Sequence, residues 1–172
     1  MTRIKKERIP RFQPGQLEAI AAILGDTSDG LTGSEIRHCL AQAGVEDTDP
    51  TLTKRHRLYN ALARQHNNDG HGSATLQVIR YAMEPARYTR NSETFEERRA
   101  ALNVPLAFVG LQLGEDGRFH RVSRANTLSE AERRASRLRK MLTNRDVHQD
   151  VLVFCRAELL QDNYFHAVLE VS

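Results

Sequence analysis

The sequence predicts a mainly helical α+β protein that contains one small β-hairpin. Apolar residues recur at helical spacing through most of the chain. Two capping boxes, Thr32-Gly33-Ser34-Glu35 and Thr127-Leu128-Ser129-Glu130, mark helix starts. Two strand-like runs flank the turn Gly114-Glu115-Asp116-Gly117, which is typical of a hairpin. Because an isolated hairpin is marginally stable, we expect it to pack against helices.

The front of the chain is predicted to be a basic arm over 1–13, followed by a helical part over 14–90. Pro14-Gly15 opens a first helix at about 16–25. The capping box at Thr32 begins a second helix, which Gly44 ends. The order and spacing of these helices are typical of a helix-turn-helix or winged-helix module.

A third helix is predicted to begin at Asp49-Pro50, as N-cap and first residue, and to run to about 66. On a helical wheel its apolar side chains share one side: Leu52, Tyr59, Leu62 and Ala63. The opposite side holds Lys54, Arg57 and Arg64, with Asn60 between the two sides. As a recognition helix, it would place the basic residues on phosphates and Asn60 at a base edge. A solvated polar face of an ordinary helical bundle explains the same pattern.

The rest of the chain is predicted as a middle part over 91–146 and a helical segment over 147–172. The helical part 14–90 ends with a fourth helix over 73–84. Beyond it, the expected elements are a helix over 92–104, strands over 107–113 and 118–122, and helices over 128–143 and 147–160. An aromatic, apolar segment follows from Tyr164 to Val171. Such segments normally pack on another element or chain, so Tyr164, Phe165 and His166 are candidate interface residues.

The sequence holds no recognisable catalytic constellation, metal site or cofactor motif. The seven histidines show neither HxH nor HExxH spacing, and no GxSxG, P-loop or GxGxxG is present. Cys39 and Cys155 lie far apart and are interpreted as buried free thiols, which fits a reducing compartment. We therefore expect no catalytic residue, no metal and no cofactor.

The composition predicts a cytoplasmic protein that does not enter a membrane. No apolar run approaches the roughly 18–20 residues that a membrane span needs. The charged N-terminus leads into no apolar stretch of the kind found in signal peptides. Nearly all basic residues are arginine, a side chain suited to carboxylates and phosphates, although GC-rich genomes give the same bias.

Several stretches of the chain resemble one bacterial family. They are residues 30–36, 49–54, 57–62, 84–88, 99–103, 110–117, 127–132, 147–152 and 155–170. Together they resemble the Ymh-type family of bacterial proteins, found in mobile-element and defence settings. The last stretch, Cys155 to Glu170, is the most specific.

The resemblance implies a front region that precedes a C-terminal domain similar to HEPN ribonucleases. That domain carries an Arg, four to six residues and a His in a dimeric cleft, a pair suited to acid–base work on an RNA 2′-hydroxyl. Asn163 to Glu170 resembles its opening helix, and the chain ends at Ser172, before the expected signature. Arg64 and His71 share the spacing but lie in the front region across a glycine-containing turn, so no catalytic residue is carried over.

The predicted function is that of a non-catalytic binding or regulatory region of a HEPN-type defence ribonuclease. It would sense a partner or ligand, or dock nucleic acid, either DNA or RNA. We expect a homo-oligomer, such as a dimer, or a partner protein held through the C-terminal helices. The alternative is a DNA-binding, transcription-regulator-like protein that uses a helix-turn-helix at about 16–84. An enzyme of unrecognised type is a third hypothesis.

Overall fold

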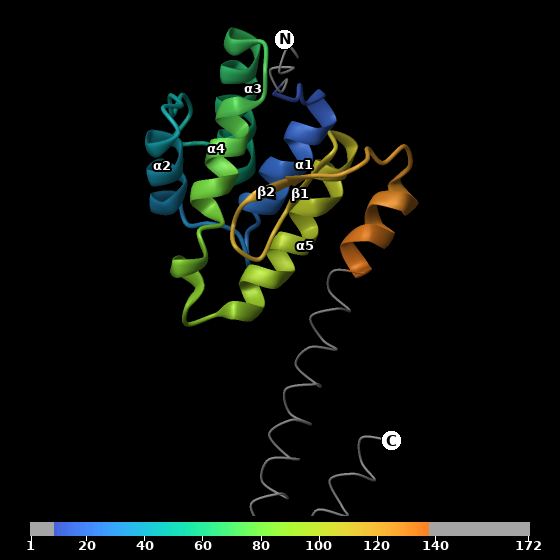
Figure 1. The fold of residues 1–172 in the computed structure, drawn as a ribbon. Coiled ribbons are helices and arrows are strands. Elements are labelled where there is room, and N and C mark those ends of the chain that lie inside the picture. The colour runs from blue at the N-terminus through green and yellow to red at the C-terminus, as the bar shows by residue number, and fades with distance from the viewer. Residues whose placement is uncertain (1–8, 138–172) are drawn as a thin grey trace, which may run out of the picture. The chain divides into compact units, whose positions relative to one another are not determined.

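The computed structural model of the chain describes residues 9–137. Met1–Ala135 forms one compact unit, and nearly all of the second unit, Ser136–Ser172, lies outside the described residues. The helices predicted beyond residue 137 and the candidate interface residues Tyr164, Phe165 and His166 also lie outside them. Within the described part, the mainly helical class with a small antiparallel hairpin is confirmed (Figure 1).

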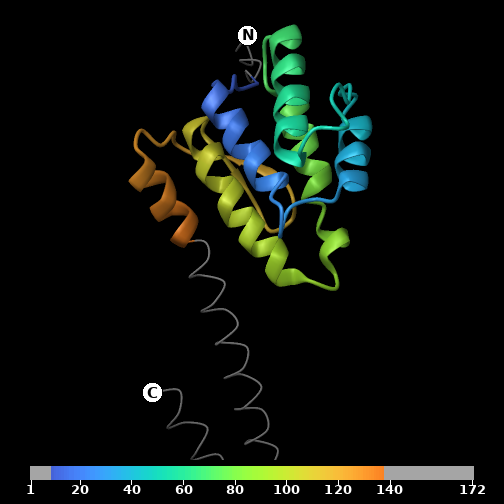
Figure 2. The same ribbon diagram turned by 180° about the vertical axis from the view of Figure 1, so that it is seen from behind.

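The helices before the hairpin pack against one another, and the hairpin lies on the last of them. The elements are α1 (Pro14–Leu24), α2 (Gly33–Gln42), α3 (Lys54–Asp69), α4 (Ser73–Ala82), the 3₁₀ turn η1 (Pro85–Tyr88), α5 (Ser92–Phe108), β1 (Leu111–Leu113) and β2 (Phe119–Arg121). A further helix starts at 128. Helix α1 packs against both α3 and α5, and α2 packs against α4, as seen from behind in Figure 2.

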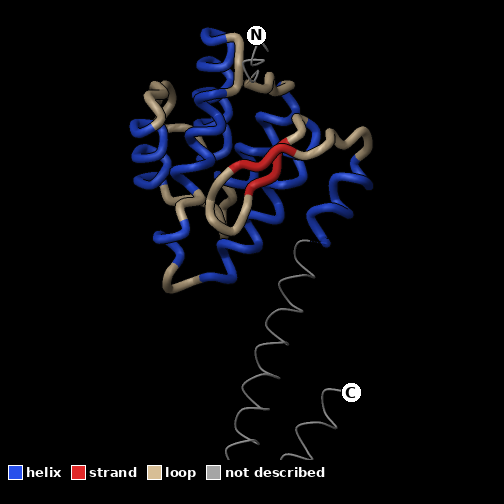
Figure 3. Tube along the Cα trace, in the orientation of Figure 1, coloured by secondary structure: helices blue, strands red, loops and turns tan. Residues whose placement is uncertain are grey.

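The hairpin is short and antiparallel, and β1 runs along α5 (Figure 3). Leu113 pairs with Phe119, and Leu111 pairs with Arg121. Leu111 and Leu113 are buried, whereas Gln112 between them is half-buried, as the twofold periodicity of a strand requires. The strands therefore present one side to the core.

One continuous core joins the helices, and it also includes a residue that the sequence assigned to the basic arm. Phe12 is only 3% exposed and lies in this core with Leu17 and Ile20. The Gly72 amide donates to the Pro10 carbonyl at 2.8 Å, and a Cβ on Gly72 would lie 2.4 Å from the Phe12 ring. The arm prediction is therefore wrong for the end of 1–13, because an aromatic side chain there fills a gap that a glycine leaves open.

The capping box at Thr32 is confirmed. The Thr32 hydroxyl accepts from the Glu35 amide at 3.2 Å, and the Glu35 carboxylate accepts from the Thr32 amide at 2.8 Å. At the second box the Thr127 hydroxyl accepts from the Glu130 amide at 3.2 Å, but the Glu130 carboxylate accepts from the Asn126 amide instead. Both helices begin where local sequence predicts.

The start of the third helix is predicted wrongly. Helix α3 begins at Lys54 with Thr53 as its N-cap, not at Pro50. The Leu52 amide donates to the Asp49 carbonyl at 3.1 Å, so the preceding residues form a turn, and Leu52 is 47% exposed rather than part of an apolar side. The helix ends at Gly70, whose φ of +69° is the left-handed conformation that glycine adopts without strain.

The first predicted strand is also too long, because α5 continues to Phe108 and β1 begins only at Leu111. Gly110 has φ of +76° and reverses the chain between them. Asn103 then fixes the strand: its amide nitrogen donates to the Leu113 carbonyl at 3.1 Å, and its oxygen accepts from the Leu113 amide at 2.6 Å. The Ala107-Phe108 pair therefore belongs to the helix.

Candidate functional site

The basic stripe predicted on the third helix does not form an exposed surface. Arg57 is buried, and its Nε donates to the Asp47 carboxylate at 2.9 Å while its Nη1 donates to the Gly33 carbonyl at 3.2 Å. The hydrogen bond to Asp47 raises the pKa of Arg57, and the same bond lowers the pKa of Asp47. Arg57 therefore holds the loop before α3 in place and is unavailable to a phosphate.

The other three predicted nucleic-acid-binding residues also turn toward loops. Lys54 Nζ lies 3.5 Å from the Thr27 carbonyl, and Asn60 Nδ2 donates to Asp49 Oδ2 at 2.9 Å. Arg64 is exposed and lies 3.6 Å from the Glu46 carboxylate. The structure thus places all four residues on α3, but it brings each one to an intramolecular partner.

The helix connections also differ from those of the predicted helix-turn-helix. Residues 43–53 join α2 to α3, a connection far longer than the turn of about three or four residues usual in that motif. The tight turn of the front part is 70–72, between α3 and α4. Helix α3 precedes this tight turn and α4 follows it, so α3 does not occupy the place of a recognition helix.

A cavity of about 350 Å³ in the described part lies between the C-terminal end of α1, the loop 25–30 and α5. Its apolar wall is made by Ala22, Ile23 and Ala101. Its polar lining is Asp26, Asp29, Thr94, Glu97 and Arg98. The cavity thus combines an apolar wall with fixed charges, as small-molecule sites commonly do.

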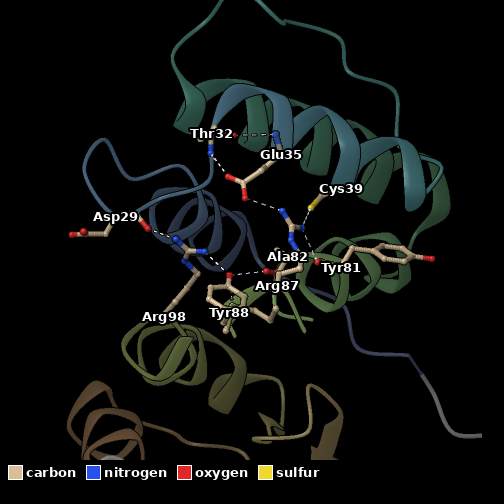
Figure 4. A network of polar contacts seen from close by, with 10 residues as sticks. Asp29, Thr32, Glu35, Cys39, Tyr81, Ala82, Arg87, Tyr88 and Arg98 are labelled. Carbon is tan, nitrogen blue, oxygen red and sulfur yellow. Dashed lines mark hydrogen bonds and ion pairs between the residues drawn. The ribbon is translucent and has the colours of Figure 1, made fainter. Parts of the chain in front are cut away.

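Arg98 lines this cavity and is only 8% exposed. Its Nη2 donates to the Asp29 carbonyl, and its Nη1 donates to the Tyr88 hydroxyl at 2.5 Å (Figure 4). The guanidinium also lies over the Tyr88 ring, 5.5 Å from its centroid. Arg98 therefore links the cavity loop to η1.

Tyr88 extends this hydrogen-bonded network to α4 and also packs against α5. Its hydroxyl donates to the Ala82 carbonyl at 2.7 Å, and its ring packs edge-on against Phe95 with centroids 5.2 Å apart. Burial raises the pKa of Tyr88, so the phenol is neutral and keeps the proton that it donates. The hydroxyl therefore accepts from Arg98 and donates to the end of α4 at the same time.

The neighbouring Arg87 joins η1 to α2. Its Nη2 lies 2.9 Å from the Glu35 carboxylate, and its Nη1 lies 3.0 Å from the Tyr81 carbonyl and 3.4 Å from Cys39 Sγ (Figure 4). Burial opposes ionisation of Glu35, but hydrogen bonds from Thr32 and Arg87 lower its pKa overall. Burial raises the pKa of Cys39, so its thiol is protonated and unreactive. Two arginines thus connect the cavity loop, η1, α2 and α5 in one network.

A second cavity of about 350 Å³ lies beside α3, next to the segment that carries Phe12. His66 lines it, is 7% exposed, and has an Nδ1 with no hydrogen-bond partner in the described structure. Phe12 packs edge-on against the imidazole, with ring centroids 6.4 Å apart. Burial lowers the pKa of His66, so its ring is neutral near pH 7.

Residues 9–137 contain no group of three or more His, Cys, Asp or Glu side chains arranged to hold a metal ion. None of the helices in that part of the chain is long and apolar enough to span a membrane.

Sequence reasoning missed Arg87 and Arg98, because their partners lie 52 and 69 residues away and no local pattern marks them. A comparison of the chain with protein-family models, with curated proteins and with solved structures gives no match.

Proposed function

We propose that this chain is a cytoplasmic, non-catalytic binding and regulatory module whose ligand enters the cavity beside Arg98. The observation that carries the proposal is the double role of Arg98. Arg98 lines the cavity, and its guanidinium bonds to both the Asp29 carbonyl and the Tyr88 hydroxyl. A ligand there would therefore act directly on a residue that ties several elements together.

The lining favours a small ligand, or a single side chain of a partner, that has an apolar body and a cationic end. Ala22, Ile23 and Ala101 supply the apolar contact. The Asp26 carboxylate accepts from the amides of Asp29 and Ser28, and these hydrogen bonds lower its pKa and keep it ionised. An ammonium or guanidinium group would be attracted to this carboxylate.

Regulation would follow from the effect of the occupant on Arg98. A cationic occupant repels the Arg98 guanidinium, and it would thereby weaken the bonds of Arg98 to Asp29 and Tyr88 and loosen the contact of η1 with α2. In the setting that the Ymh-type resemblance implies, such a change would restrain or guide a HEPN ribonuclease domain. The cavity supports the binding part of this proposal, and the ribonuclease part rests on the resemblance.

An NMR screen of a library of small primary amines and guanidines against the full chain tests the binding part. Bound compounds should shift the amide signals of Ala22, Thr94 and Ala101, and Ala101→Phe should abolish the effect by filling the cavity. Ala100→Phe, at a neighbouring position of α5 outside the cavity lining, is the matched control. Shifts that persist in Ala101→Phe, or a library without any bound compound, would contradict the proposal.

A nuclease assay tests the non-catalytic part. The assay compares this chain with a version extended into a complete HEPN domain. We expect metal-independent RNase activity only in the extended protein. Equal activity in both would show that the residues present here suffice for catalysis. Oligomerisation or partner binding through Tyr164, Phe165 and His166 stays a prediction that the same extended protein allows to be tested.

DNA binding through a helix-turn-helix at 16–84 is the weaker alternative. The Arg57 side chain donates hydrogen bonds to the Asp47 carboxylate, and the Asn60 side-chain amide donates to the Asp49 carboxylate. Arg64 is the one exposed basic side chain of the four candidate residues on α3. Loss of duplex binding on changing Lys54 and Arg64 to Glu would restore this alternative.

A further inference from the structure

We infer that β2, the segment after it and the start of the following helix form a docking surface for the phosphodiester backbone of a nucleic acid. We call this surface the arginine face and define it by Arg118, Arg124 and Arg133. It is separate from the Arg98 cavity, and its residues are not those of the α3 stripe. Such a surface would give the chain a function beyond the proposed ligand-sensing role.

Charge is distributed very unevenly along the described chain. Residues 9–117 contain fourteen Asp and Glu but only eleven Lys and Arg, a net charge of −3. Residues 118–135 contain five arginines and two glutamates, a net charge of +3. Within residues 9–135, a net positive charge is therefore found only in β2, the segment after it and the start of the following helix. Local concentration of one sign of charge is the usual electrostatic footprint of a nucleic-acid partner.

Six of the ten arginines of residues 9–117 have bonded partners within the fold, and the other four, Arg11, Arg37, Arg80 and Arg90, are spread over exposed sites. Arg55 pairs with Glu18 at 2.6 Å and Arg99 pairs with Glu96 at 2.6 Å, while Arg57 and Arg87 have the carboxylate partners described above. Arg124 and Arg133 lie close together in the sequence and are also exposed, and Arg133 contributes to lowering the pKa of Glu130, which pairs with Arg134. Arg118 is 81% exposed and lies 4.0 Å from Asp116. These three guanidinium groups remain available for an external anion.

The backbone under the arginine face is held firmly. The Val122 amide donates to the Gly110 carbonyl at 3.0 Å, and the Ala125 amide donates to the Ala107 carbonyl at 2.9 Å. Arg134 then ties the helix back to this segment, since its guanidinium bonds to the Ser123 carbonyl and to Glu130. Binding would therefore cost little ordering of the backbone.

Two features favour a nucleic acid over an anionic membrane surface. Every basic residue of 118–135 apart from His120 is an arginine, whose planar fork donates two parallel hydrogen bonds to a phosphate. The apolar side of the helix is already covered, because Ala131 and Ala135 are buried, and Leu128 is its one exposed large apolar side chain within residues 128–137. A helix that lies in a membrane surface needs a broad free apolar side.

The test measures binding of the full chain to a random-sequence DNA duplex and to a single-stranded RNA of equal length, by fluorescence anisotropy over a range of salt concentrations. The triple variant Arg118→Gln, Arg124→Gln, Arg133→Gln should bind at least about tenfold more weakly at low salt. The slope of log affinity against log salt should fall by about 0.7 to 0.9 for each phosphate that the variant no longer neutralises. The triple variant Arg37→Gln, Arg80→Gln, Arg90→Gln removes the same charge from exposed sites elsewhere and should bind within about twofold of the unchanged protein.

Binding to the duplex, the RNA or both supports the inference and identifies the source of the phosphodiester. Ala101→Phe should leave this binding unchanged, so failure of the Arg98 proposal and failure of this one are distinguishable. Three results would overturn the inference: no binding to either nucleic acid, equal weakening in both triple variants, or binding only to phosphatidylserine vesicles. Circular dichroism of each variant establishes that a loss of binding is not a loss of folding.

Discussion

Arg57 of α3 and Asp47 of the loop before it form an ion pair in which the arginine side chain is almost completely buried. The helical wheel places Arg57 beside Lys54 and Arg64, on the side expected to face a partner. The structure instead uses it to close the loop 43–53 against α3, with the Gly33 carbonyl as a second partner. Because of this pair, Arg57, the most obvious candidate for phosphate contact, has a structural role instead.

Changing Asp47→Asn should destabilise the fold by about 3 kcal/mol, because it leaves the buried Arg57 charge without its counter-ion. Glu46→Gln, the neighbouring exposed partner of Arg64, should change stability by less than about 1 kcal/mol. Urea unfolding of both variants gives the comparison. Similar small losses for the two would mean that the Arg57 pair contributes no more than a surface pair does.

Asn103→Leu should detach β1 from α5. The substitution leaves the Leu113 amide and carbonyl buried without the two hydrogen bonds that Asn103 supplies, at a cost of about 1–3 kcal/mol. Amide hydrogen exchange at Leu113 should accelerate, whereas the half-buried Gln112→Leu should leave that amide protected. Retained protection of Leu113 in Asn103→Leu would show that the strand pairing alone holds the hairpin.

Gly72→Ala should release the segment that carries Phe12. The φ of Gly72 is −90°, so the backbone tolerates a side chain, but the added Cβ would lie 2.4 Å from the Phe12 ring. We expect a loss of about 1–3 kcal/mol from this overlap. Gly15→Ala, where a Cβ meets nothing within 4 Å, should be neutral or stabilising by up to about 1 kcal/mol in thermal unfolding. Equal behaviour of the two variants would mean that Phe12 is not held by Gly72.

His66 should make stability depend on pH below neutrality. Burial lowers its pKa in the folded protein, so below about pH 6.5 the unfolded chain binds a proton that the folded chain does not. The stabilisation from the neutral ring is complete above this pH and is lost as the pH falls toward the lowered folded pKa. Urea unfolding at about pH 7.5 and about pH 5.5 should show this loss, and His66→Gln should reduce it. His38→Gln, at an exposed site, should preserve it; an unchanged pH dependence in His66→Gln would assign the effect to other groups.

The features that were predicted correctly from sequence are those fixed by neighbours in the chain. The Thr32 capping box needs only residues three apart, and the hairpin turn needs only Gly117, whose φ is +72°. The mainly helical class follows from the same local periodicity. Such interactions are encoded within a few residues, so a single sequence suffices to predict them.

The features that were missed depend on contacts between distant parts of the chain. Arg57 is buried because residues 10 and 24 positions earlier, Asp47 and Gly33, supply its hydrogen-bond acceptors. The Arg98 cavity combines residues of α1 and α5 that lie about seventy positions apart. No periodicity in the sequence reports these contacts.

The central claim is that Arg98 couples the cavity loop to α2 through η1, and hydrogen exchange of Arg98→Gln tests it most directly. Arg90→Gln, an exposed arginine two residues before α5, is the matched control. We expect faster amide exchange in Arg98→Gln over the loop 25–30, η1 and the first turn of α2, with α3 and the hairpin unchanged. Unchanged amide exchange in those three segments, or a uniform increase in the exchange rate over all of residues 9–137, would contradict the claim.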